Sequence, residues 1–175
     1  MRPMPESAYP KLDAISTALL VRNASGELHA ASARDVLGAA HAVIDELYAP
    51  GTALGSPEAA RRYLSVHYAG REEEVFSMVL LDPQNTIVGI TDLFRGTIDS
   101  AAIYPREVVK TALRYNAHSV LLAHNHPSGH AEPSAADRTL TERLRCALMT
   151  VDIRVLDHLV VGGNAMTSFA ARGWL

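Results

Sequence analysis

The chain has 175 residues, of which 48% are hydrophobic and 20% are charged, and these proportions exclude a disordered or fibrous chain. Sixteen Lys and Arg against nineteen Asp and Glu give a net charge of −3, which disfavours a nucleic-acid partner. The single cysteine, Cys146, excludes an intramolecular disulfide and a cysteine-rich zinc site, and it fits a cytoplasmic location. No apolar run approaches the roughly 20 residues that span a bilayer, so no membrane partner is expected.

Residues 1–52 are expected to form an N-terminal arm and a helical extension. The first 12 residues carry three prolines and predict a loose arm, and the pattern up to residue 28 is weak. Apolar residues then recur at helical spacing from Ser32 to Tyr48, before the breaker residues at 49–52. This helix can pack on the following domain or mediate a homodimer.

Residues 53–175 are expected to form a separate domain in which strands and helices alternate. Predicted helices cover residues 57–68, 104–115 and 134–149, and the first has Ser56 as N-cap and Pro57 at its first position. Predicted strands cover residues 74–81, 86–93, 119–123, 153–161 and 165–169. The mixture predicts an α/β or α+β fold with a sheet covered by helices.

The segment from residue 124 to residue 137 carries the most informative side chains. His124 and His126 lie two residues apart at the end of an apolar strand, so both imidazoles face one side and can reach one ion. With Asp137 on the first turn of the next helix, they can hold a tetrahedral Zn²⁺ that keeps one position open for water. The histidines can instead be a polar strand end. Ser134 and Asp137 also fit a capping box, in which Asp137 caps through one oxygen and ligates through the other.

The pattern His-x-His, seven residues, Ser, two residues, Asp resembles the JAMM motif of JAB/MPN-domain metalloproteins. The blocks YPREVVKTAL, AHNHPSG, VDIRVLDHLVVG and FAARGWL resemble those of the RadC family, over about residues 53–175. The resemblance implies the JAB/MPN fold, which is similar to the cytidine-deaminase architecture. That fold has a mixed central sheet flanked by helices, with zinc at a strand end.

The JAMM pattern also needs an upstream glutamate, for which Glu72, Glu73 and Glu74 are candidates. Glu74, directly before Val-Phe, matches the RadC-like pattern best, although such a run is otherwise a solvated acidic face. The resemblance implies a zinc-dependent metallopeptidase or amidohydrolase that cleaves a peptide or isopeptide-like amide. In that reaction Glu74 is the general base, and Ser134 donates a hydrogen bond to the developing oxyanion.

The alternative function is a non-catalytic JAB/MPN interaction module associated with DNA repair or recombination, with zinc structural or absent. Full-length RadC relatives usually carry an N-terminal helix-hairpin-helix region, and residues 1–52 are too short for it, so a short form is expected. A metal-dependent nuclease is disfavoured because no run of Lys or Arg supplies a basic groove. A zinc deaminase is disfavoured because its Pro-Cys-x-x-Cys ligands cannot be built from one cysteine.

Several other polar residues leave alternatives open. His130 stands where the RadC-like pattern usually has Asp, and it either faces water in the loop or approaches the metal. Asp157 and His158 lie within an apolar strand, where they either orient a metal ligand or form a structural pair. Asn125 sets the loop geometry or contacts substrate. Cys146 is expected to be a small buried residue.

Overall fold

The computed structural model describes residues 19–23, 25–48, 50–96 and 103–175, and the predicted arm over residues 1–12 lies outside them. The chain divides into two compact units, Met1–Val43 and Ile44–Leu175. In the first unit, β1 (Leu20–Arg22) and β2 (Leu28–Ala30) pair as an antiparallel hairpin that the weak sequence pattern did not predict. The predicted helix after it is confirmed as α2 (Ala33–Leu47), which continues into the second unit.

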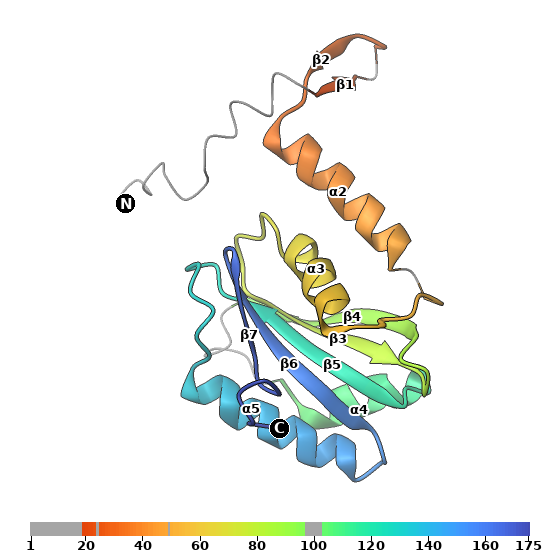
Figure 1. Cartoon of the computed structure of the whole chain (residues 1–175), viewed down its shortest axis with the longest axis vertical. Helices are drawn as coiled ribbons and strands as arrows, with labels where there is room; N and C mark the ends of the chain where they lie inside the picture. The colour runs from red at the N-terminus through yellow and green to blue at the C-terminus, as the bar shows by residue number, and fades with distance from the viewer. Residues whose placement is uncertain (1–18, 24, 49, 97–102) are drawn as a thin grey trace. The chain divides into compact units, whose positions relative to one another are not determined.

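The second unit contains one mixed sheet of five strands in the order β4-β3-β5-β6-β7 (Figure 1). The strands are β3 (Val75–Leu81), β4 (Ile87–Arg95), β5 (Ser119–Asn125), β6 (Arg154–Gly162) and β7 (Ala165–Ser168). Strands β5 and β6 are parallel, and the other neighbouring pairs are antiparallel. The predicted α/β class, with a mixed central sheet flanked by helices, is therefore confirmed.

Helices cover both faces of the sheet. Helix α3 (Pro57–His67) lies on one face, and helices α4 (Pro105–Arg114) and α5 (Ala135–Met149) lie on the other (Figure 1). Alternate residues of β3 separate two cores, since Val75 and Val79 pack on the α3 side while Phe76 and Met78 pack on the α4 and α5 side. A central strand that is covered on both faces has a nearly continuous apolar sequence, and β3 has the sequence VFSMVLL.

Strand β5 is longer than predicted and carries polar residues into the sheet. The expected end was Ala123, but His124 pairs with Phe76 of β3 and Val160 of β6, and Asn125 pairs with Val161. Both added residues are buried. Because Leu122 belongs to the core on the α4 and α5 side, the strand period of two places His124 on that side as well.

The loop from β5 to α5 lies against the end of β6. A side chain at Gly162 would overlap the backbone of His130 and Ala131, so only glycine allows this approach. Helix α5 then begins with Ser134 as N-cap, and its predicted capping box with Asp137 is confirmed.

The expectation for Cys146 is wrong. Cys146 is exposed on α5, because this helix turns the opposite side, with Leu140, Leu144 and Leu148, toward the core. Its thiol donates to Oε1 of Glu142 at 3.3 Å instead of packing in the interior. Among the described residues, no helix is long and apolar enough to cross a bilayer.

Candidate metal centre

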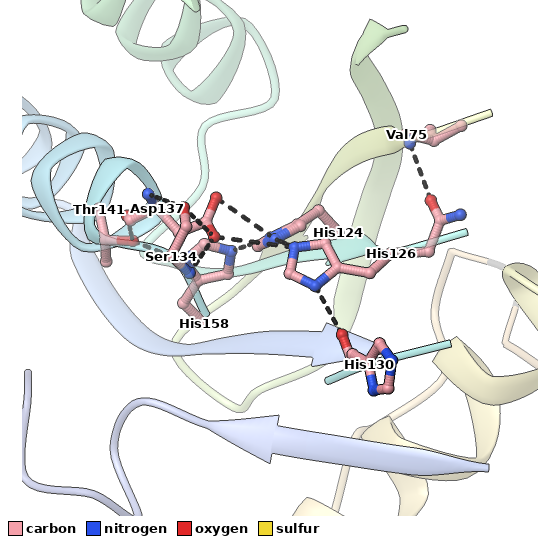
Figure 2. A network of polar contacts seen from close by, with 9 residues as sticks. Val75, His124, His126, His130, Ser134, Asp137, Thr141 and His158 are labelled. Atoms are coloured by element: carbon pink, nitrogen blue, oxygen red, sulfur yellow. Dashed lines mark hydrogen bonds and ion pairs between the residues drawn. The ribbon is translucent and has the colours of Figure 1, made fainter. Parts of the chain in front are cut away.

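Four side chains meet beside the adjacent ends of β3 and β5. Glu74, His124, His126 and Asp137 each offer one ligand atom, and these atoms all lie within 4.8 Å of one another. Nε2 of His124 lies 3.0 Å from Nε2 of His126 and 3.5 Å from Oδ1 of Asp137. Figure 2 shows that both imidazoles and the carboxylate point toward one another. His124 and Asp137 are buried, whereas the His126 and Glu74 side chains are partly exposed, so the group opens to solvent on one side.

Strand pairing explains why Glu74 joins this group. In the antiparallel pair of β3 and β5, Phe76 lies opposite His124, so the residue two before Phe76 and the residue two after His124 continue on the same face. Those residues are Glu74 and His126. Of the other two candidate glutamates, Glu72 is exposed and Glu73 turns to Arg95, with 3.7 Å between Oε1 and the guanidinium. The base role of Glu74 stays a prediction.

Asn125 holds the backbone on both sides of Glu74. Its Oδ1 accepts a hydrogen bond from the amide of Val75 at 2.8 Å, and its Nδ2 donates to the carbonyl of Glu73 at 2.9 Å. Asn125 as a whole residue is 4% exposed, which puts these bonds in a region with little water. Of the two roles left open for Asn125, this geometry supports a backbone role, with the carboxamide fixing the start of β3.

Asp137 uses its two oxygens differently. Oδ2 accepts hydrogen bonds from the amide and the hydroxyl of Ser134, both at 2.7 Å, while Oδ1 faces His124. Burial disfavours a charged Asp137, but the contact with His126 and the hydrogen bond from Ser134 favour it, and the pKa of this carboxyl lies well below its usual range. Asp137 is therefore a carboxylate at neutral pH. Its Oδ1 is directed at His124, and its capped Oδ2 also lies 3.7 Å from Nε2 of His126.

His126 is oriented by the loop that follows it. Its Nδ1 lies 2.7 Å from the backbone carbonyl of His130, so Nδ1–H donates there and Nε2 faces the cluster. The carboxylate of Asp137, 3.7 Å from Nε2, raises the pKa of His126 above its ordinary value, against the opposing effect of burial. The imidazole of His130 is exposed and is not part of the four-residue group. Of the two alternatives for His130, the structure favours the loop residue that faces water.

A second imidazole lies behind His124. Nε2 of His158 is 2.8 Å from Nδ1 of His124, and Nδ1 of His158 is 2.6 Å from the hydroxyl of Thr141. Burial, followed by the neighbouring His124, holds the pKa of His158 well below its ordinary value. Asp157 instead accepts hydrogen bonds from Ser168 and from the amide of Ala170, which tie β6 to the C-terminal residues. Thr141 had no sequence signal, since it is one of several threonines in this helix region.

The donor set fits a divalent metal ion. Two imidazole nitrogens with defined outer hydrogen bonds, and an ionised carboxylate with one oxygen directed inward, are the ligands that hold zinc in open sites. The same set also suits Fe(II), so the ligands alone do not select zinc.

Known proteins resemble this chain over the unit that carries the cluster. A RadC-like JAB domain matches residues 54–174. The chain is 56% identical over 124 residues to a UPF0758 protein of Saccharophagus degradans, covering 71% of this chain and 55% of that protein. It is 51% identical over 140 residues to a UPF0758 protein of Tolumonas auensis, covering 80% and 62%. A UPF0758 protein of Vibrio cholerae is 49% identical over 141 residues, covering 81% and 89%.

These matches differ in how much of each relative they cover. The chain spans 55% and 62% of the length of the first two relatives, so the activity of those whole proteins does not transfer with the match. The domain match nevertheless includes all four residues of the cluster and both of the helices that follow β4. On this similarity and on the mixed sheet that carries the cluster, the chain belongs to the family of RadC-like JAB-domain proteins.

Proposed function

We propose that this protein is a zinc-dependent metallopeptidase or amidohydrolase of the JAMM type that hydrolyses a peptide or isopeptide-like amide. The observation that carries the proposal is the convergence of Glu74 with His124, His126 and Asp137 in one partly open group. A structural zinc site is closed by four protein ligands, whereas a catalytic site has three and keeps one position open for water, and the partly exposed side of this group supports the second arrangement. The exposed free thiol of Cys146 supports a cytoplasmic location as part of the same proposal.

In this proposal His124, His126 and Asp137 hold the ion. A bound zinc ion supplies a Lewis acid that polarises a carbonyl and brings the pKa of water toward about 7. Outer contacts of two of these residues keep their ligand atoms directed inward: the His130 carbonyl on His126 and the Ser134 cap on Asp137.

Glu74 then acts as the general base. Its partly exposed carboxylate can take a proton from an attacking water and return it to the leaving amine. Ser134 has two functions in this scheme. Its hydroxyl donates to Oδ2 of Asp137 in the resting protein, so stabilising an oxyanion requires that the hydroxyl turn from Asp137 toward the substrate.

The test compares two neighbouring glutamates. Wild type, Glu74→Gln, Glu73→Gln and His126→Ala are purified without a tag, analysed for metal content, and incubated with a peptide library that is read by mass spectrometry. We expect zinc in every protein except His126→Ala, and hydrolysis by wild type and Glu73→Gln alone. Glu73→Gln is the matched control because the Glu73 side chain faces Arg95 rather than the cluster.

The other outcomes are equally informative. If zinc is bound but none of the four proteins hydrolyses a peptide, the interaction-module alternative is favoured. Iron in place of zinc would refute the metal assignment. Hydrolysis that persists in Glu74→Gln would refute the assigned base.

A further inference from the structure

A buried chain of hydrogen bonds connects His124 to helix α5 (Figure 2). Nδ1 of His124 lies 2.8 Å from Nε2 of His158, and Nδ1 of His158 lies 2.6 Å from Oγ1 of Thr141. The Thr141 hydroxyl also donates to the backbone carbonyl of Asp137 at 2.6 Å. His124 and His158 are fully buried and Thr141 is 2% exposed, so water does not compete for these bonds.

The last bond in the chain fixes the direction of all the others. The carbonyl of Asp137 can only accept, so the single hydroxyl proton of Thr141 lies toward it. Oγ1 of Thr141 must then accept from Nδ1–H of His158. The ring of His158 is fully buried and contacts the rings of Phe76 and Phe169, with centroid distances of 5.3 and 4.6 Å, and an unpaired cation would be costly at such a buried position.

A neutral His158 that donates through Nδ1 has a bare Nε2, which can only accept. The contact with His124 at 2.8 Å therefore requires that Nδ1 of His124 carry a proton and donate it. Nε2 of His124 is then unprotonated, and this is the atom that faces His126 and Asp137. The hydrogen-bond chain thus leaves a lone pair at the position where a metal ligand needs one.

We infer that His158 is a positioning residue, and that Thr141 anchors it, so that together they hold His124 in its Nδ1–H tautomer with Nε2 presented to the metal. The inference rests on the proposed function in taking His124 as a ligand. The chain also returns to the backbone of Asp137, a second proposed ligand, so it connects ligands on β5 and α5 through a residue of β6. An outer partner of this kind typically changes metal affinity by about 10–100-fold when it is removed.

The tautomers are tested without any metal. Long-range ¹H–¹⁵N correlation spectra of the full chain, metal-free and labelled in its histidines, report which ring nitrogen carries the proton. We expect the Nδ1–H form for both His124 and His158. A His124 protonated at Nε2 alone, or a doubly protonated His158, would overturn the inference whether or not the protein hydrolyses anything.

The positioning role is tested through zinc affinity, measured by competition with a chelator. Thr141→Val keeps the shape of the side chain but removes the hydroxyl, whereas the matched control Thr141→Ser keeps the hydroxyl. We expect Thr141→Val to bind zinc about 10–100-fold more weakly and Thr141→Ser to retain the wild-type affinity. His158→Gln offers one acceptor and one donor, so it should bind more tightly than His158→Phe.

Urea unfolding of the metal-free variants separates positioning from folding. A merely structural role predicts that Thr141→Val loses stability with unchanged zinc affinity, and that result would refute the inference. If wild-type protein binds no zinc while the tautomers are as expected, the proposed function fails and the hydrogen-bond chain stands.

Discussion

The substitution Asn125→Ala tests how the start of β3 is held beside the cluster. It removes the two hydrogen bonds of the carboxamide of a residue that is 4% exposed. The amide of Val75 loses its acceptor, and since Val75 is 0% exposed, an unsatisfied amide there costs about 1–3 kcal/mol. The carbonyl of Glu73 belongs to an exposed residue and can bind water instead, so the second bond contributes about 1 kcal/mol.

The expected loss in the free energy of unfolding for Asn125→Ala is therefore about 2–4 kcal/mol. For a chain of this size that loss corresponds to a fall in Tm of about 10 °C. Urea unfolding followed by circular dichroism measures the first quantity, and amide hydrogen exchange at Val75 locates it. Asn125→Asp keeps an acceptor for the Val75 amide but replaces the donor with a charged oxygen that faces the Glu73 carbonyl, so it should lose stability and still retain protection at Val75.

Two results would refute this reasoning about Asn125. A loss below about 0.5 kcal/mol would mean that the two bonds contribute no more than an ordinary surface contact. Equal loss of Val75 protection in Asn125→Asp and Asn125→Ala would mean that the acceptor oxygen is not what holds the strand.

Three further predictions concern other parts of the second unit. Gly162→Ala should displace the loop backbone at Ala131 and weaken zinc binding, measured by chelator competition, because that loop supplies the carbonyl that orients His126. The contact with His67 holds the pKa of Asp92 well below its usual range despite burial, so the stability gained from this carboxylate is present above about pH 4 and lost as the pH falls further. Asp92→Asn removes this carboxylate. Its free energy of unfolding, measured in urea, should therefore decline less than that of wild type between about pH 5 and about pH 3. Cys146 should react with a thiol reagent in the folded protein, but more slowly than a free thiol, because the hydrogen bond to Glu142 raises its pKa.

Local signals were sufficient to predict most elements of the fold. Ser56 with Pro57, and Ser134 with Asp137, mark helix starts by chemistry that acts within one turn. The end of β5 was predicted too early, because a sequence of histidine and asparagine is typical of a loop. Those residues stay in the sheet since β3 and β6 pair with them on both sides, and such pairing cannot be read from a local window.

The part of the candidate cluster that depends on short-range spacing in the sequence was predictable. His124 and His126 share a face because strands repeat every two residues, and Asp137 follows at a helix start. The resemblance alone selected Glu74, because three consecutive glutamates have the same side chain and nothing in the local sequence distinguishes them. The physical distinction is long-range: β3 pairing turns Glu74 to the histidines, while Glu73 faces Arg95 on β4.

Asp157 and His158 show why two alternatives for adjacent polar residues need not compete. Successive side chains of a strand point to opposite faces, so each member of the pair meets different neighbours. Asp157 hydrogen-bonds Ser168 and the C-terminal backbone, which is a structural role, and His158 contacts a proposed ligand, which is an orienting one. The partner that gives His158 its direction is Thr141, 17 residues away on a helix, and only the packing of α5 on β6 brings them together. The two members of a polar pair within an apolar strand are therefore better interpreted separately, because each side chain contacts the elements that cover its own face of the sheet.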